Sequence, residues 1–259
     1  MSELIGSLLD NNSPFGRIMT RFGIIIGANL MFLLFSFPLV TVGPAYVALY
    51  HVMLRTLRGD GVLNPFKEFW KGFRSNFRQA MIVWLSALLL AFVFYLEFRI
   101  VGQMSGSIEI IRYPLLAIAA ILLMVVIYSF PVMAAFADSI PHLLRNAIFF
   151  ILKKPWKMLI IAFFNIFPMY LTYSDPQYMP LYAFLWIMFG FGAVALLGSV
   201  LLLPEFKPFL PLVDDEGDFL YDEDGNVLMP GQEGKYAAAE GGPEMTDREA
   251  LDVMKKLGM

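Results

Sequence analysis

The chain has 259 residues, of which 58% are hydrophobic and 16% are charged. A soluble domain carries about 25% charged residues, so the composition excludes an ordinary soluble domain. The absence of cysteine also excludes disulfides, thiolate metal sites and thiol nucleophiles. The net charge of −3 averages two unlike parts, since residues 205–259 carry −9 and the remainder carries +6.

Five apolar blocks approach or exceed the length that crosses a bilayer. A bilayer core of about 30 Å takes roughly 20 helical residues. The fourth block is the shortest and contains Pro168. The sequence predicts an all-α membrane protein, with a bundle of five transmembrane helices, cytoplasmic interfacial helices and a short acidic cytoplasmic tail. The predicted spans are residues 22–42, 80–100, 113–137, 157–173 and 180–203.

Lys and Arg are distributed unevenly between the segments that connect these spans. Alternate segments hold 15 of them, and the other segments hold four. Connecting segments rich in Lys and Arg stay in the cytoplasm. We therefore expect an N-terminus outside the cell, formed by residues 1–21, and a cytoplasmic C-terminus.

The first apolar block contains an Asn at its middle and a proline-rich interruption near its end. Asn29 could form hydrogen bonds to another helix, and so could Asn165 in the fourth block; such bonds contribute ~0.6 kcal/mol on average. The interruption, residues 38–44, reads PLVTVGP. Its two prolines and one glycine leave backbone groups that must be satisfied locally, so we expect the span to end or break here. Residues 44–57 would then run on as a second helix along the cytoplasmic interface. The residues of interest in this motif are Pro38, Thr41, Gly43 and Pro44.

The next segment, residues 64–78, interleaves aromatic and basic residues. Asn64 and Pro65 suit an N-cap and a first helical position. At helical periodicity, five aromatic residues share one face and four basic residues lie beside it. This pattern occurs in proteins that bind single-stranded nucleic acid, but the adjoining spans favour a lipid bilayer with anionic headgroups as the partner and no nucleic acid. The aromatic residues are Phe66, Phe69, Trp70, Phe73 and Phe77, and the basic ones are Lys67, Lys71, Arg74 and Arg78.

The chain shows no pattern typical of an active site. His51 and His142 are the two histidines, and neither lies in a metal-binding motif. Phosphate loops, nucleophile triads and paired carboxylates are absent from the sequence as well. We expect no enzyme activity, no cofactor and no metal site.

The acidic tail, residues 205–259, contains two predicted elements. Residues 219–221 and 227–229 could pair as a hairpin around Asp224 and Gly225. Residues 246–258 begin with a capping box and predict a short amphipathic helix on a tether. The tail would act either as a solubilising extension or as a docking peptide.

Three segments of the chain resemble the YesL-like membrane protein family, also called DUF624. The resemblance implies a multi-pass protein of the bacterial cytoplasmic (inner) membrane. Members of the family are often encoded beside genes for carbohydrate uptake and breakdown, which implies an accessory role in sugar transport. The residues that carry the resemblance are Asn29, Pro38, Thr41, Gly43, Pro44, Leu49, Tyr50, Phe69, Phe73, Asn76, Phe77, Phe130, Pro131 and Asn146.

Three functions agree with these observations. The first is a non-enzymatic accessory or assembly factor for ABC-type sugar transport, with carbohydrate ABC transporter subunits as partners. The alternatives are a small transporter in its own right, and a membrane sensor or regulator that signals through the acidic tail. The oligomeric state stays open.

Overall fold

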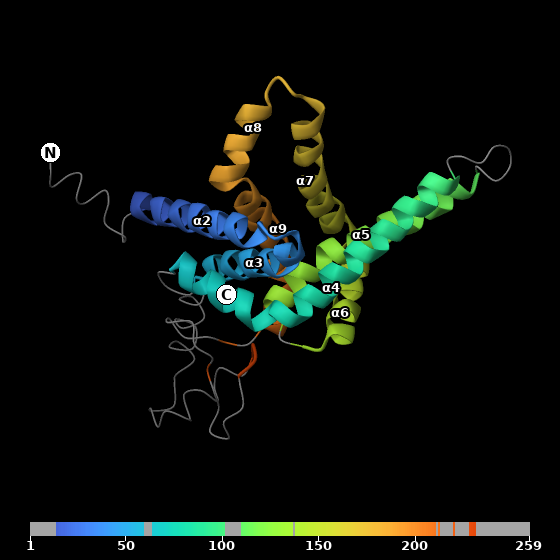
Figure 1. The fold of residues 1–259 in the computed structure, drawn as a ribbon. Coiled ribbons are helices and arrows are strands. Elements are labelled where there is room, and N and C mark those ends of the chain that lie inside the picture. Colours follow the sequence, from blue (N-terminus) through green and yellow to red (C-terminus); the bar gives the residue numbers. More distant parts are fainter. Residues whose placement is uncertain are drawn as a thin grey trace, which may run out of the picture.

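The computed structural model describes residues 14–59, 64–101, 110–136, 138–210, 212, 220 and 228–231. Over these residues the ordered elements are helices, and three arms diverge from a common centre (Figure 1). One arm is a single helix, and each of the other two is a pair of helices joined at the tip. The arms are α2 (Pro14–Ser36), the pair α4 (Pro65–Val101) and α5 (Arg112–Ala135), and the pair α7 (Pro155–Ser174) and α8 (Met179–Leu185).

Five of the described helical segments are long and apolar enough to cross a membrane. This confirms the predicted all-α membrane fold. The fifth segment is composite, because α8 continues through a π-helical turn, η3 (Trp186–Gly190), into α9 (Phe191–Phe206) and a short 3-10 turn, η4 (Lys207–Phe209). The five segments are Ile18–Ser36, Pro65–Val101, Arg112–Ala135, Pro155–Ser174 and Met179–Phe209.

The proline-rich motif breaks the first apolar block, as expected. Helix α2 ends at Ser36, before the predicted residue 42, and α3 (Val42–Arg58) follows after a 3-10 turn, η1 (Leu39–Thr41). Pro38 disfavours helical geometry at the residue before it. The Thr41 hydroxyl donates to the carbonyl oxygens of Phe35 at 2.6 Å and Pro38 at 2.8 Å, which satisfies backbone groups that the break frees.

Helix α3 lies at the centre of the fold rather than along an interface. Eleven of its 17 residues are buried, and it packs against α2, α4, α5 and α9. A helix that is apolar on most of its surface is stable only when other elements cover it, so the expectation of an interfacial helix is corrected. The helix ends at Gly59, whose φ of 87° lies in the left-handed region that favours glycine.

The aromatic–basic segment and the second predicted span form one continuous helix, α4. Asn64 caps this helix, since its side-chain oxygen accepts from the backbone N–H groups of Phe66 at 3.0 Å and Lys67 at 3.3 Å. Phe69 and Phe73 are buried and pack on Phe35. The ring centroid of Phe35 lies 5.7 Å from that of Phe69 and 4.9 Å from that of Phe73. Part of the aromatic face therefore belongs to the protein core, and not to the membrane surface as predicted.

Two glycines allow α3 and α4 to approach closely. A Cβ atom on Gly43 would lie 2.4 Å from Cβ of Trp84, and one on Gly72 would lie 2.9 Å from Cβ of His51. Because real Cβ atoms do not come this close to other heavy atoms, a larger residue would force the helices apart. The two contacts lie toward opposite ends of the α3–α4 pair.

The remaining helix, α6 (Ile140–Lys153), connects α5 to α7. Its buried residues Leu143, Ala147 and Phe150 follow helical spacing and face the core. Of the predicted hairpin, the structure describes Leu220, Leu228 and Met229, and the N–H of Leu228 donates to the backbone oxygen of Leu220 at 2.8 Å. Its other residues and the predicted helix at 246–258 lie outside the described residues.

Candidate functional site

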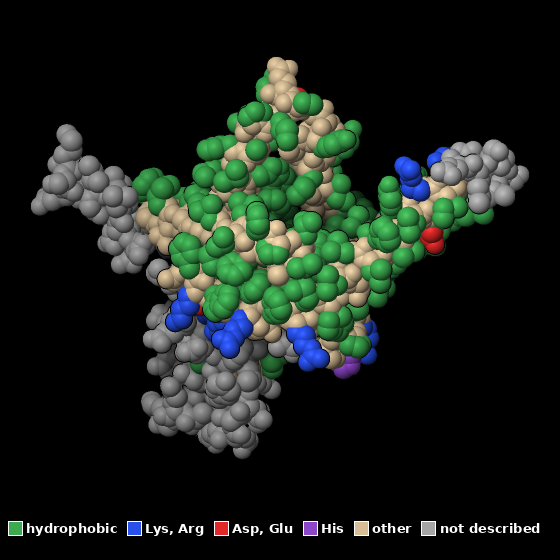
Figure 2. Space-filling view, in the orientation of Figure 1, with side chains coloured by type: hydrophobic (Ala, Val, Ile, Leu, Met, Phe, Trp, Pro, Cys, Tyr) green, Lys and Arg blue, Asp and Glu red, His purple; other side chains and the backbone are tan. Residues whose placement is uncertain are grey.

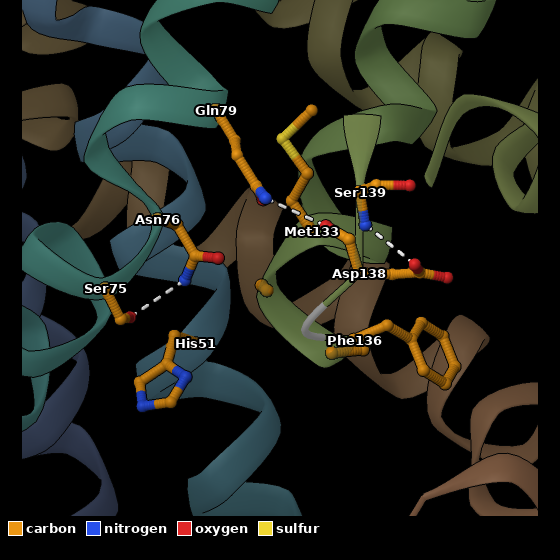
Figure 3. Close-up of a pocket in the computed structure, with 10 residues that line it drawn as sticks. His51, Ser75, Asn76, Gln79, Met133, Phe136, Asp138 and Ser139 are labelled. Atoms are coloured by element: carbon orange, nitrogen blue, oxygen red, sulfur yellow. Dashed lines mark hydrogen bonds between the residues drawn. The ribbon is translucent and has the colours of Figure 1, made fainter. Parts of the chain in front are cut away.

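An open cavity of about 660 Å³, lined by both polar and apolar residues, lies between α3, α4 and the turn from α5 to α6 (Figure 3). Ligand pockets commonly occupy about 300–1,000 Å³ and present a few convergent polar groups. This cavity has both properties. Its lining residues are His51, Ser75, Asn76, Gln79, Met133, Ala134, Ala135, Phe136, Asp138 and Ser139.

Three separate elements bring the polar groups of the cavity together. Helix α4 contributes Ser75, Asn76 and Gln79, which helical spacing places on one side. Helix α3 contributes His51, whose ring reaches the cavity because Gly72 leaves room for it. The α5–α6 turn contributes Asp138, which follows the end of α5.

The turn is held against α4 by hydrogen bonds. The Gln79 amide donates to the backbone oxygen of Asp138 at 2.8 Å. The Asp138 carboxylate accepts from the backbone N–H of Ser139 at 2.7 Å and lies 3.1 Å from Nδ1 of His142. The Ser139 N–H and, to a smaller extent, His142 and Arg145 hold the pKa of Asp138 below its usual range. The cavity rim thus carries a carboxylate at neutral pH.

Acceptor atoms predominate among the polar groups that are not already bonded. The Asn76 amide donates to the Gly72 carbonyl at 3.2 Å and to Oγ of Ser75 at 3.0 Å. Its side-chain oxygen points into the space between α4 and the α5–α6 turn (Figure 3). Among the described residues, nothing donates to this oxygen or to the side-chain oxygen of Gln79.

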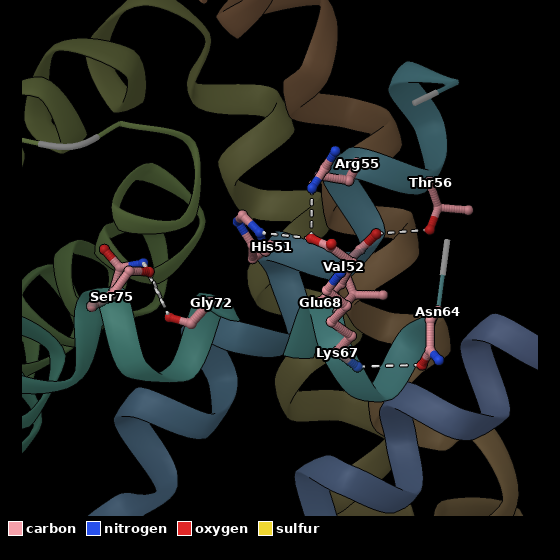
Figure 4. A network of polar contacts seen from close by, with 10 residues as sticks. His51, Val52, Arg55, Thr56, Asn64, Lys67, Glu68, Gly72 and Ser75 are labelled. Carbon is pink, nitrogen blue, oxygen red and sulfur yellow. Dashed lines mark hydrogen bonds and ion pairs between the residues drawn. The ribbon is translucent and has the colours of Figure 1, made fainter. Parts of the chain in front are cut away.

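A buried ion pair lies directly beside the cavity (Figure 4). Glu68 accepts a 2.7 Å hydrogen bond from Arg55 and lies 3.5 Å from Nε2 of His51. The side chains of Glu68 and Arg55 are only 11% and 12% exposed. Charges removed from water are tolerated when they are paired, and this pair joins α3 to α4 beside His51.

A second charged cluster fixes α6, α7 and α9 to one another. Glu205 of α9 lies 3.1 Å from Lys153 and 2.9 Å from Lys157. Lys157 also donates to the backbone oxygen of Leu201 in α9 at 2.8 Å. This cluster lies outside the cavity and contributes to packing.

The motif and basic residues singled out in the sequence do not line this cavity. Pro38, Thr41, Gly43 and Pro44 form the α2–α3 break and the start of α3. Lys67, Lys71, Arg74 and Arg78 are exposed on α4. Figure 2 shows Lys and Arg side chains along the lower edge of the molecule and hydrophobic side chains over the arms.

Asn29 and Asn165 each bond to other helices. The Asn29 amide donates to the carbonyls of Trp186 at 3.0 Å and Ile187 at 2.8 Å, and its oxygen accepts from the Gly192 N–H at 2.9 Å. These are backbone groups of the π-helical turn and the start of α9, where the regular bonding changes. Asn165 accepts a hydrogen bond from the Tyr46 hydroxyl of α3.

Sequence reasoning missed the cavity itself. The available signal was the polar group at positions 75, 76 and 79, directly before an apolar run, together with Asp138 directly after another apolar run. The missing information was the pairing of α4 with the α5–α6 turn. Among the described residues, no group of three His, Asp or Glu side chains could hold a metal ion.

The chain is similar to a described protein family and to a bacterial protein. Residues 25–98 match the model of the family described as protein of unknown function, DUF624. The chain is 28% identical over 137 residues to the uncharacterized protein YesL of Bacillus subtilis (strain 168), a match that covers 52% of this chain and 65% of YesL. No solved structure matches the chain significantly. The chain thus has the apolar helices of an all-α membrane protein and is similar to the DUF624 family over residues 25–98.

Proposed function

We propose that this protein is a non-enzymatic accessory or assembly factor for ABC-type carbohydrate uptake in a bacterial cytoplasmic membrane. The observation that supports this role best is the divergence of its apolar arms. Only 6% of the most apolar stretch of α4 is buried within the protein. Large apolar side chains along it are exposed, such as Leu89 at 66% and Phe92 at 57%.

Diverging arms suit a protein that completes its packing with another membrane subunit. Transmembrane helices associate through close packing and hydrogen bonds, because lipid tails already solvate apolar side chains. The exposed apolar side chains of the arms would provide surfaces on which helices of a transporter permease pack.

The distribution of charge supports a functional face toward the cytoplasm. The predicted orientation assigns the exposed Lys67, Lys71, Arg74 and Arg78 to that side, where they would meet anionic headgroups. The cavity borders the same part of α4. It would open where the ATPase subunits of an ABC transporter bind.

Co-purification tests the accessory role. The full chain would be tagged at its C-terminus, solubilised from native membranes in a mild detergent during growth on plant-type sugars, and analysed by mass spectrometry. We expect permease or ATPase subunits of a sugar transporter in stoichiometric amounts. Recovery of the tagged protein alone, together with unchanged sugar uptake in a deletion strain, would refute the role.

A second candidate is a small transporter in its own right, and the cavity is the observation that favours it. A cavity that opens on one side of the membrane is what one state of an alternating-access cycle presents. Uptake of radiolabelled sugar by proteoliposomes that contain only this protein would establish this function. Proteoliposomes without uptake, made from protein that co-purifies with a transporter, would leave the accessory role.

A further inference from the structure

We propose that the cavity between α3, α4 and the α5–α6 turn binds a neutral polyhydroxyl compound, such as a mono- or disaccharide, through the side chains of Asn76, Gln79 and Asp138. This inference rests on the proposed function, since it names the ligand class of the same cavity. It is carried by the charge, the unpaired atoms and the size of the lining.

The charge of the lining argues against an anionic ligand. None of the ten lining residues is Lys or Arg. A phosphate or carboxylate is bound in proteins by Arg, Lys or converging N–H donors. Here the Ser139 N–H is already used by the Asp138 carboxylate, so the cavity offers an anion little compensation for lost water.

The unpaired atoms of the lining call for donors on the ligand. The side-chain oxygens of Asn76 and Gln79 accept nothing from the described residues, while both N–H groups of the Asn76 amide and one of the two of Gln79 are already bonded within the protein. One oxygen of the Asp138 carboxylate is bonded to Ser139 and lies near His142, and the other has no hydrogen-bond partner among the described residues. Hydroxyl groups can donate to each of these acceptors, and one molecule with several hydroxyls can satisfy them together.

The size and rigidity of the cavity suit such a molecule. Its volume of about 660 Å³ exceeds that of a single sugar ring and accommodates a disaccharide with some water. The Gln79 bond to the Asp138 backbone holds the two walls at a fixed spacing. Because this hydrogen bond already ties α4 to the backbone of Asp138, a ligand that contacts both would have less to order on binding.

Binding is tested with the full chain in lipid nanodiscs by isothermal titration calorimetry. The probes are glucose, maltose, sucrose and myo-inositol, with choline chloride and inorganic phosphate as charged comparators. We expect saturable binding of at least one neutral probe. No saturation by any of them up to about 10 mM would overturn the inference, and so would tighter binding of choline or phosphate.

Two variants locate the site. Asn76→Leu removes an acceptor while keeping a similar shape, and Ser75→Trp fills the mouth of the cavity from an exposed position. Each should weaken binding by about tenfold or more, a loss of ~1.4 kcal/mol. Lys71→Gln, on an exposed part of the same helix outside the lining, is the matched control and should bind as the parent does. Size-exclusion profiles and thermal unfolding without ligand establish that each variant is folded.

If a neutral probe binds but both variants bind it unchanged, the ligand lies elsewhere and the inference fails. Failure of this proposal is distinguishable from failure of the proposed function. If the protein co-purifies with a transporter but binds no sugar, the accessory role stands and the ligand proposal fails. If the protein binds sugar but no transporter co-purifies with it, the ligand proposal stands and the accessory role fails.

Discussion

The side chain of Asn29 in α2 donates a 2.8 Å hydrogen bond to the backbone oxygen of Ile187, inside the π-helical turn of the fifth span. The same side chain bonds to Trp186 and Gly192 and is fully buried. One amide therefore satisfies two carbonyls and one N–H where the helix departs from α geometry. It also joins the first predicted span to the last.

Replacing Asn29 with Leu should strongly destabilise the protein. Leucine has a similar size, but it removes the hydrogen bonds of one buried and two part-buried backbone groups, and a buried group left unsatisfied costs about 1–3 kcal/mol. Relaxation of the π-helical turn would recover part of the lost stability, so we expect the free energy of unfolding to fall by about 2–4 kcal/mol. The free energy of unfolding can be measured in mixed micelles, by raising the fraction of a denaturing detergent.

Leu30→Ala is the control for this prediction, because Leu30 follows Asn29 directly and is 42% exposed. It should change the free energy of unfolding by less than about 1 kcal/mol. Equal effects of the two substitutions would show that the amide bonds contribute little, and that the turn is stable without them.

The Glu68–Arg55 pair should contribute to stability only while both partners are present. Glu68→Gln leaves the Arg55 guanidinium in a largely covered position. Removing one partner of a buried pair costs about 3–5 kcal/mol, and a pair near the end of the helices should fall at the lower end, about 3 kcal/mol. Denaturant titration of the purified protein measures the loss.

A double-mutant cycle with Arg55→Met completes the test. The double variant should be less destabilised than the sum of the two single variants, because the attraction between the two side chains can be lost only once. Lys67→Gln, an exposed neighbour of Glu68, should have almost no effect. Strict additivity of Glu68→Gln and Arg55→Met would contradict a direct interaction.

The positions of helices could be predicted largely from apolar length, whereas their mutual packing could not. The break at Pro38 followed from the geometry of proline alone. The burial of α3 did not, because the periodicity of residues 44–57 fits a helix at an interface and a helix covered by protein equally well. Phe69 and Phe73 illustrate the same limit, since only the position of Phe35 on α2 decides that they face protein rather than lipid.

The candidate site was hidden for a related reason. Asn76, Gln79 and Asp138 are ordinary polar residues at the ends of apolar runs, and no spacing rule links positions 79 and 138. Their relation is created by the way α4 meets the turn after α5. Asn29, by contrast, could be singled out from the sequence, because a polar residue within an apolar block needs a partner.

The basic residues of α4 should help to set the orientation of the protein in the membrane. Replacing Lys67, Lys71, Arg74 and Arg78 with Glu removes four positive charges from a segment expected in the cytoplasm. We expect phosphatase and fluorescent-protein reporters fused at the C-terminus to report mixed orientation. Replacement of the same four residues with Gln is the matched variant and should have a weaker effect. Unchanged reporter activity in the Glu variant would exclude a role of these residues in topology.

The contact between Gly198 of α9 and Tyr50 of α3 allows a prediction about packing. A Cβ atom on Gly198 would lie 2.6 Å from the Tyr50 hydroxyl oxygen. Gly198→Ala should therefore destabilise the protein by about 1–3 kcal/mol through overpacking. Tyr50→Phe alone should be neutral or stabilising, because that hydroxyl is buried without a hydrogen-bond partner among the described residues. Thermal unfolding in detergent measures both.

Combining the two substitutions tests the cause of the effect. The double variant should recover part of the stability lost in Gly198→Ala, since the closest atom is gone and the next ring atom lies 3.0 Å away. Gly43→Ala is the matched comparison, because its clash is with Cβ of Trp84 and the backbone oxygen of Ala80. Tyr50→Phe should not rescue Gly43→Ala. Equal rescue of both glycine variants would mean that Tyr50→Phe stabilises the fold generally, and that the α3–α9 contact is not what limits the size of residue 198.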